Sequence, residues 1–213
     1  MLKGNFQLPL VFDIGATAAF ALTGAFAGAR RGYDLVGVFF LAAATSLGGG
    51  LIRDGIFLHR GVPVAVENPD YLLTVVVACT AGLLLASRMR RFEQWITLGD
   101  ALGLGTYAVV GAQMTLQAGL GMTAALLIGV LNATGGGLLR DVLAREEPFV
   151  FKPGEFYALV AFGGAASFIV MAAVFQMDAT TSALISIALT FSLRILTVKF
   201  KWRTRPVSLP PDV

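Results

Sequence analysis

Long apolar runs with few or no ionisable residues are the feature that most restricts the fold of this chain. They occupy most of the 213 residues, and only 14% of the residues are charged. In a soluble domain such runs would leave too little polar surface to face water, whereas helices of about 20 apolar residues cross a bilayer. The runs are continuous and rich in Ala and Leu, without the alternation of a barrel strand. The sequence therefore predicts an all-α membrane protein.

Breaks that carry charge, proline or glycine divide these runs into seven expected transmembrane helices. The expected ranges are about 8–29, 34–58, 70–88, 95–117, 119–144, 155–175 and 179–198. The weakest break, Gln117-Ala118-Gly119, leaves room only for a tight turn. Seven spans of about 20 residues leave too few residues for a soluble domain. We therefore expect residues 1–213 to form a single transmembrane domain.

Lysine and arginine are distributed unevenly between the two sides of a seven-span chain. One side holds eleven of them, namely Arg30, Arg31, Arg88, Arg90, Arg91, Arg145, Lys152, Lys199, Lys201, Arg203 and Arg205. The other side holds Lys3 and Arg60. Because basic loops stay in the cytoplasm, we expect the N-terminus outside and the tail 199–213 in the cytoplasm. This tail should anchor the last helix at the interface, with residues 206–213 disordered.

Several chemistries are not expected. Cys79 and His59 are the only cysteine and histidine, too few for a disulfide or a Cys/His metal cluster within one chain. The sequence contains no nucleophile–base set and no nucleotide-binding loop, so we expect neither an enzyme nor a cofactor. The basic residues belong to the cytoplasmic loops, and we expect no nucleic acid partner.

The sequence repeats itself at an offset of 87 residues. The stretch 45–54, TSLGGGLIRD, returns at 132–141 as NATGGGLLRD. Other equivalent residues at this offset are Asp13 and Asp100, Phe20 and Tyr107, and Gly24 and Gly111.

The offset spans three helices, and three is an odd number, so the second copy must run opposite to the first. We expect two inverted three-helix repeats, at about 9–88 and 95–175, followed by a seventh helix at about 179–198. Inverted repeats of this kind occur in transporters, whose binding sites lie on interrupted helices near the bilayer midplane.

Glycine triplets stand within the second and the fifth expected helix. They are Gly48, Gly49, Gly50, Gly135, Gly136 and Gly137. Each glycine costs about 1 kcal/mol of helix propensity relative to alanine. The triplets either allow close helix packing or interrupt the helix and free carbonyls toward a water-filled path. We favour the path, because a tandem triplet exceeds what packing needs and both copies stand beside charges.

Six charged residues inside the spans are repeated at the same offset. They are Asp13, Arg53, Asp54, Asp100, Arg140 and Asp141. Such residues are costly in a bilayer and are therefore functional candidates. Sequence neighbours point about 100° apart on a helix, so we expect the arginines to pair at matching depth, as Asp13–Arg53 and Asp100–Arg140. Asp54 and Asp141 would then attract cations. The alternative is that the pairs only lock the fold.

Neutral oxygens stand just before each triplet. The candidates are Thr45, Ser46, Asn132 and Thr134. They would either line the path or bond their own helix backbone.

The doubled motif Gly-Gly-Gly-x-x-Arg-Asp, at 48–54 and 135–141, resembles that of prokaryotic trimeric intracellular cation channels. The resemblance covers about residues 9–198. It implies homotrimers in the prokaryotic plasma (inner) membrane, with a pore in every subunit lined by the second and fifth helices, kinked at their glycines. It also implies conduction of monovalent cations, chiefly K⁺, with the motif residues in the pore.

Two other functions remain open at this stage. Related sequences have also been described as glycine transporters, which could use the same inverted-repeat path. A non-conducting scaffold or lipid-binding protein would fit charges that only lock the fold. The ligands expected are permeant K⁺ or Na⁺ and bound membrane lipid.

Overall fold

The computed structural model describes residues 2–59, 61–85, 89–151, 153 and 156–205, with only the backbone at 89–96. Most of these residues are helical. The α-helices are α1 (Leu10–Arg30), α2 (Leu35–Leu51), α3 (Val64–Glu67), α4 (Pro69–Leu85), α5 (Met89–Gln117), α6 (Met122–Leu143), α7 (Tyr157–Ile169) and α8 (Ala179–Lys199). The π-helical segments η1 (Ile52–Leu58) and η3 (Val170–Val174) continue α2 and α7.

Helices occupy most of each range expected from the apolar runs. Among the described residues, five helices are long and apolar enough to cross a membrane: Leu10–Arg30, Leu35–Leu58, Met122–Leu143, Tyr157–Val174 and Ala179–Lys199. α4 is apolar but shorter. This confirms an all-helical chain of membrane type.

The structure differs from the expected helix boundaries at two places. α5 begins at Met89, so the break expected at 88–93 is helical from that residue onward. α3 lies in a stretch expected to be a loop, where the Pro63 carbonyl accepts the N–H groups of Val66 and Glu67. The tight turn after Gln117 is present, and Gly119 adopts the positive φ of +80° that glycine tolerates without strain.

Part of the charge count lies outside the described residues or side chains. This applies to Arg60, Arg88, Arg90, Arg91 and Lys152, and to the segment 206–213 that was expected to be disordered.

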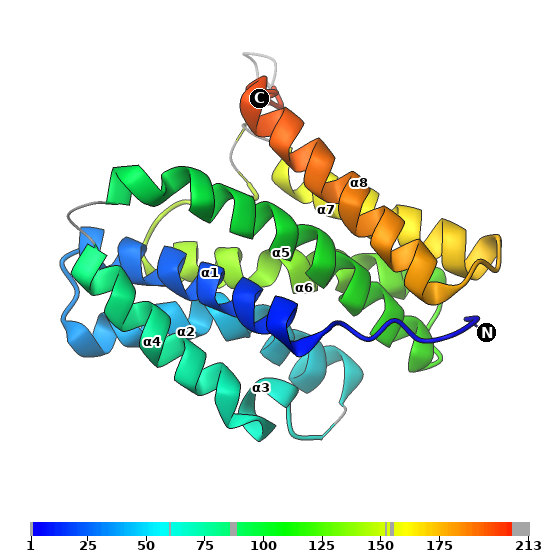
Figure 1. Ribbon diagram of the computed structural model, residues 1–213, viewed down its shortest axis with the longest axis horizontal. Coiled ribbons are helices and arrows are strands. Elements are labelled where there is room, and N and C mark those ends of the chain that lie inside the picture. Colours follow the sequence, from blue (N-terminus) through cyan, green and yellow to red (C-terminus); the bar gives the residue numbers. More distant parts are fainter. Residues whose placement is uncertain (1, 60, 86–88, 152, 154–155, 206–213) are drawn as a thin grey trace, which may run out of the picture.

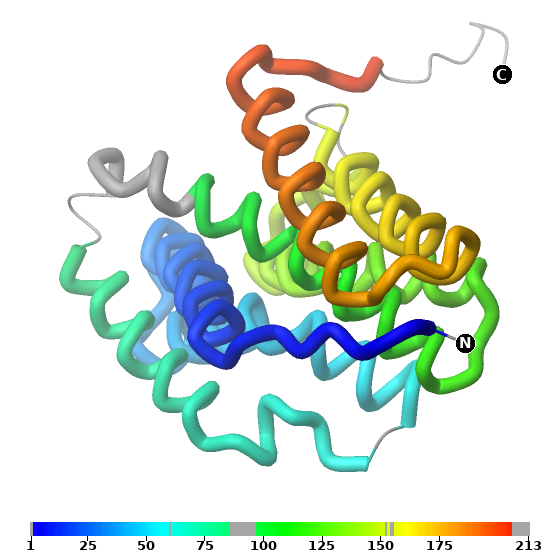
Figure 2. Tube along the Cα trace, turned by 45° about the vertical axis from the view of Figure 1, so that its right-hand side comes forward, coloured from blue at the N-terminus to red at the C-terminus, as the bar shows by residue number. Residues whose placement is uncertain are grey.

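The longer helices form two groups of three, with α8 at one edge (Figures 1 and 2). In the first group α1, α2 and α4 pack against one another, and in the second group α5, α6 and α7 do so. The groups meet where α2 contacts α6 and α1 contacts α5, while α8 packs on α5 and α7. In Figure 1, α1 and α5 run in opposite directions.

Small residues fill the interior and large apolar ones lie outside. Alanine is the most frequent buried residue type in the two main apolar clusters, and this lets helices approach closely, as in membrane bundles. Leu, Val and Phe are exposed along the outer faces of α2 and α4, for example Val36, Phe40, Leu73 and Val77. The outside of the bundle is therefore suited to hydrocarbon.

Candidate functional site

α2 and α6 cross at their glycine triplets. Both triplets lie in continuous α-helix, so the expectation that the glycines interrupt the helix is wrong, whereas a kink at the glycines stays a prediction. A Cβ at Gly49 would collide with the carbonyl oxygen of Asn132, and a Cβ at Gly136 would collide with that of Thr45. The middle glycines therefore let the two backbones touch, which is the packing interpretation.

The third glycine of each triplet has another role. A Cβ at Gly50 would lie 3.9 Å from Nη2 of Arg53, and a Cβ at Gly137 would lie 4.0 Å from Nη2 of Arg140. These glycines leave space beside the motif arginines, at the edges of two cavities.

The first of these cavities has a volume of about 160 Å³ and lies between α1, α2, η1, α3, α4, α5 and α6. We call it the Asp13 cavity. Its polar lining residues are Asp13, Thr17, Thr45, Ser46, Arg53, Asp54, Tyr71, Tyr107 and Asn132.

Arg53 pairs with its own neighbour. Its Nε lies 2.6 Å from Oδ1 of Asp54 and its Nη2 lies 2.7 Å from Oδ2, which is the two-pronged geometry of a strong guanidinium–carboxylate pair. Both residues are buried in η1. A weaker contact of 3.4 Å joins Nη1 to Oδ1 of Asn132 on α6.

The expected Asp13–Arg53 pair is therefore wrong. The Cβ atoms of neighbouring residues point apart on a helix, but the arginine side chain is long enough to curl back to the next residue. In a poorly hydrated interior, the nearest carboxylate compensates the charge best.

Asp13 is held by tyrosines instead. The Tyr107 hydroxyl donates to Oδ1 at 2.9 Å, and the Tyr71 hydroxyl donates to Oδ2. Within the described part of the chain Asp13 forms no ion pair, although it lines the same cavity as Arg53. Thr17 Oγ1 lies 3.4 Å from the Tyr107 hydroxyl.

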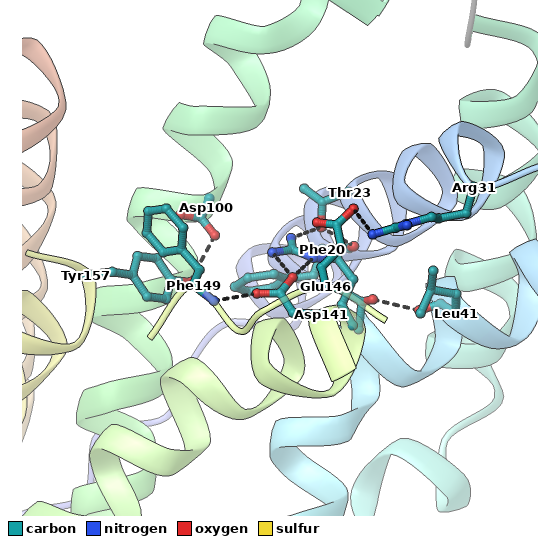
Figure 3. Close-up of polar contacts among 11 residues, drawn as sticks. Phe20, Thr23, Arg31, Leu41, Asp100, Asp141, Glu146, Phe149 and Tyr157 are labelled. Carbon is teal, nitrogen blue, oxygen red and sulfur yellow. Dashed lines mark hydrogen bonds and ion pairs between the residues drawn. The ribbon is translucent and has the colours of Figure 1, made fainter. Parts of the chain in front are cut away.

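The second cavity has a volume of about 450 Å³ and lies between α1, α5, α6, the loop after α6, α7 and α8. We call it the Asp100 cavity, and Figure 3 shows part of it. Its polar lining residues are Thr23, Thr97, Asp100, Thr134, Arg140, Asp141, Tyr157 and Arg194.

Arg140 also pairs with its neighbour, so the expected Asp100–Arg140 pair is wrong for the same reason. Nε and Nη2 lie 2.9 and 2.8 Å from the same oxygen, Oδ1 of Asp141. The other oxygen accepts the Phe149 backbone N–H at 2.8 Å, as Figure 3 shows. Nη1 reaches Thr23 on α1 at 3.4 Å.

Asp100 lies against Tyr157 and Arg194. The Tyr157 hydroxyl donates to Oδ1 at 3.1 Å (Figure 3), and Nε of Arg194 lies 4.0 Å from Oδ2. The Arg194 guanidinium also stacks 4.8 Å above the Tyr157 ring. Arg194 stands near the end of α8, where a long basic side chain can extend to the interface, but it is only 6% exposed.

Phe20 lies between the two cavities. It lines both of them and stacks on Tyr107, with ring centroids 5.8 Å apart. The two residues are equivalent at the 87-residue offset. The paired rings therefore form the boundary between the cavities.

The predicted neutral oxygens all line a cavity, and three of them bond their own helix. Thr45, Ser46 and Thr134 donate to carbonyls four residues earlier, at 2.6–2.9 Å. Asn132 instead donates to the Tyr107 carbonyl at 2.7 Å. Hydroxyl donors used in this way still present oxygen lone pairs to the cavity.

Sequence reasoning missed the aromatic and α8 members of these sites. Tyr71, Tyr157 and Arg194 belong to neither copy of the motif. A signal was available for Phe20 and Tyr107, because they align at the same offset as the motif, and for Arg194, as a charge within an apolar span. Tyr71 and Tyr157 stand 86 residues apart, one residue short of the repeat offset, so an alignment without gaps does not pair them.

A protein-family model and several bacterial membrane proteins match the sequence of this chain. A protein-family model described as "Glycine transporter" matches residues 10–87 and 97–173, two stretches that begin 87 residues apart. A membrane protein of Deinococcus radiodurans is 36% identical over 72% of this chain and 71% of its own length. The Escherichia coli inner membrane protein YadS is 30% identical over 88% of this chain and 90% of its own.

Solved structures of TRIC channels share the fold. A TRIC cation channel superposes with a TM-score of 0.87, at 28% identity over 96% of this chain and 99% of its own. The TRIC orthologue of Rhodobacter sphaeroides has a TM-score of 0.81, at 32% identity over 91% and 98%. With these extents of similarity, the chain is a membrane protein that belongs to the family of prokaryotic TRIC (trimeric intracellular cation) channels, the resemblance noted from the doubled motif.

Proposed function

We propose that this protein conducts monovalent cations, chiefly K⁺, along a path that joins the Asp13 cavity to the Asp100 cavity within each subunit. One observation carries the proposal. Each cavity is lined by the arginine and aspartate of one copy of the repeated motif, and the two cavities share Phe20 as a common wall. The family's solved cation channels support the same function.

The proposed architecture has seven membrane-spanning helices in a single domain, as two inverted three-helix repeats and a seventh helix. The family match in two stretches supports it. Contacts that recur at the 87-residue offset support it as well: a Cβ at Gly24 would meet Thr45, and one at Gly111 would meet Asn132.

In this proposal the repeated residues line the path in different ways. The motif arginines and aspartates form the polar wall of each cavity, and Thr45, Ser46, Asn132 and Thr134 add neutral oxygens. Gly50 and Gly137 widen the cavity edges beside the arginines, while Gly49 and Gly136 hold the helices that carry them. Gly48 and Gly135 stand at the same crossing.

The assembly and location follow from the family and from the charge distribution. We propose a homotrimer in the plasma (inner) membrane, in contact with its lipids, with the N-terminus outside and the C-terminus in the cytoplasm. Under this orientation the Asp13 cavity opens outward and the Asp100 cavity opens to the cytoplasm.

Glycine transport is the second candidate, because the matching family model carries that description. If glycine bound in the Asp13 cavity, Arg53 would be the cation among the described lining residues that could bind its carboxylate. Arg53 is the arginine of the smaller cavity, and Asp54 already engages its Nε and Nη2. A substrate carboxylate would therefore have to displace this pair, and this favours the channel.

Recording purified protein in planar bilayers under asymmetric KCl tests the proposal. We expect discrete current steps that reverse near the K⁺ equilibrium potential. The absence of current, together with saturable uptake of labelled glycine into proteoliposomes, would replace the channel by the transporter.

Phe20→Ala tests whether the shared wall limits the path. We expect a conductance at least about twofold higher, at a cost of about 3 kcal/mol in stability for a buried phenylalanine. Phe26→Ala is the control, since Phe26 is a buried residue of the same helix and lines neither cavity. A similar gain in conductance for both variants would remove Phe20 from the path.

A further inference from the structure

The two cavities carry different net charges although they contain the same motif. Among the residues that the structure describes, the Asp13 cavity is lined by two aspartates and one arginine, and the Asp100 cavity by two aspartates and two arginines. In each cavity the motif arginine is paired with the next aspartate. The difference in net charge therefore comes from the groups that contact the carboxylates of Asp13 and of its equivalent, Asp100.

Asp100 is accompanied by a cation from α8. Arg194 lies 4.0 Å from its carboxylate, and stacking on the Tyr157 ring holds the guanidinium in place. α8 lies outside both stretches that match the family model, so the first half of the chain has no counterpart of this arginine. The extra helix thus brings a positive charge to one cavity only.

Asp13 is accompanied by neutral donors. Two tyrosine hydroxyls bind its carboxylate, and among the described residues no cation pairs with it. Hydroxyl groups stabilise a carboxylate without cancelling its charge. A full negative charge therefore remains in a cavity of about 160 Å³, where low dielectric strengthens its action on a passing ion.

We infer that Asp13 is the residue that selects cations over anions, and that Arg194 cancels the same selectivity at Asp100. The inference rests on the proposed channel function. It makes the path electrically polarised: one end attracts monovalent cations and the other is neutral. The phenol oxygens beside Asp13 supply the oxygen ligands that a partly dehydrated K⁺ or Na⁺ takes.

Three variants test this inference, each measured as the K⁺ to Cl⁻ permeability ratio from reversal potentials in asymmetric KCl. Asp13→Asn should lower the ratio by about tenfold, because it removes the net charge near the ion. Arg194→Gln should raise it, because it removes the positive charge that lies beside Asp100. The double variant Asp100→Asn/Arg194→Gln should keep the wild-type ratio, because the net charge of its cavity is unchanged.

Controls separate selectivity from folding. Asp13→Glu should retain the ratio, and Asp70→Asn should leave it unchanged, because Asp70 is exposed and lines neither cavity. A misfolded protein cannot gain selectivity, so the rise expected for Arg194→Gln does not depend on how well Asp13→Asn folds.

Failure of the inference and failure of the channel proposal give different results. A wild-type protein that passes no current overturns the channel function itself. A wild-type protein that conducts, with an unchanged ratio in Asp13→Asn and in Arg194→Gln, overturns the inference and leaves the channel.

Discussion

In the Asp13 cavity the motif arginine contacts both oxygens of the following aspartate, whereas in the Asp100 cavity it contacts one oxygen and the loop after α6 takes the other. Arg53 and Asp54 thus form a closed pair, in which both carboxylate oxygens bind the arginine. Arg140 and Asp141 form an open network, in which one oxygen binds the arginine and the other binds a backbone N–H. The side chain of Arg53 is 10% exposed and that of Arg140 is 25% exposed. The sequence repeat therefore places the same residue types at equivalent positions, and the neighbouring residues determine which contacts these side chains form.

Removing the motif arginine should produce the largest difference in stability between variants of the two cavities. Arg53→Gln leaves Asp54 buried without its partner, at a cost of about 3–5 kcal/mol. Arg140→Gln should cost about half of that, because Asp141 keeps the Phe149 N–H and more water reaches the site. Chemical unfolding in detergent micelles measures both values, and equal losses would contradict the difference between closed pair and open network.

Charge reversal provides the control for the pairing itself. Arg53→Asp combined with Asp54→Arg should recover most of the lost stability, whereas Arg53→Asp combined with Asp13→Arg should not. Recovery by the second combination alone would restore the Asp13–Arg53 pair expected from helix depth.

The glycine crossing should respond alike on both sides. Gly49→Ala and Gly136→Ala each place a methyl group against a backbone carbonyl of the facing helix, at a cost of about 1–3 kcal/mol. Gly50→Ala and Gly137→Ala meet no atom closer than 3.9 Å and should raise stability by up to about 1 kcal/mol through helix propensity. Thermal unfolding checks this, and destabilisation by the third glycines would disprove the assignment of roles within the triplet.

Much of the fold could be predicted from the sequence, because span length and uncharged composition are properties of the chain alone. The turn at Gly119 and the start of α4 at Pro69 follow from local backbone chemistry. α3 and the early start of α5 at Met89 could not be predicted in the same way, because α3 has only four residues, too few to show a helical period, and α5 begins in a charged stretch beside the span.

The candidate site could be predicted as a set of residues but not as a set of contacts. Sequence equivalence identified Asp13 and Asp100 as related positions. It could not reveal that Asp13 faces two tyrosines whereas Asp100 faces one tyrosine and an arginine. Tyr71 and Tyr157 do not align at the offset of 87, and Arg194 lies outside both matched stretches. The reach of a long side chain such as Arg53 likewise depends on neighbours that only the fold brings together.

The tyrosines that support the two aspartates should have smaller effects. Tyr71→Phe removes one of two hydroxyl donors to Asp13, and Tyr157→Phe removes the hydroxyl donor to Asp100. A hydrogen bond to a charged group contributes about 1.5–3 kcal/mol, and we expect the lower end of that range for Tyr71. Tyr157→Phe should cost less, because Arg194 remains beside Asp100.

Unfolding in detergent measures the two tyrosine variants, and the K⁺ to Cl⁻ ratio serves as their control. The ratio should stay at the wild-type value in both, because neither substitution changes a charge. A larger loss of stability for Tyr157→Phe than for Tyr71→Phe would mean that Asp100 depends on its hydroxyl donor more than on Arg194.

The smallest expected effect is a rectification of the current that depends on salt. A path with one negative and one neutral end gathers cations at one entrance, so currents at equal positive and negative voltages should differ, by about twofold in 0.01 M KCl, where the Debye length is about 30 Å. In 1 M KCl, where it is about 3 Å, the difference should vanish. Asp13→Asn should abolish it at low salt, and Arg194→Gln should reduce it by making both ends negative. Rectification that persists in 1 M KCl would have to arise from the shape of the cavities, since a screened charge cannot act across the path.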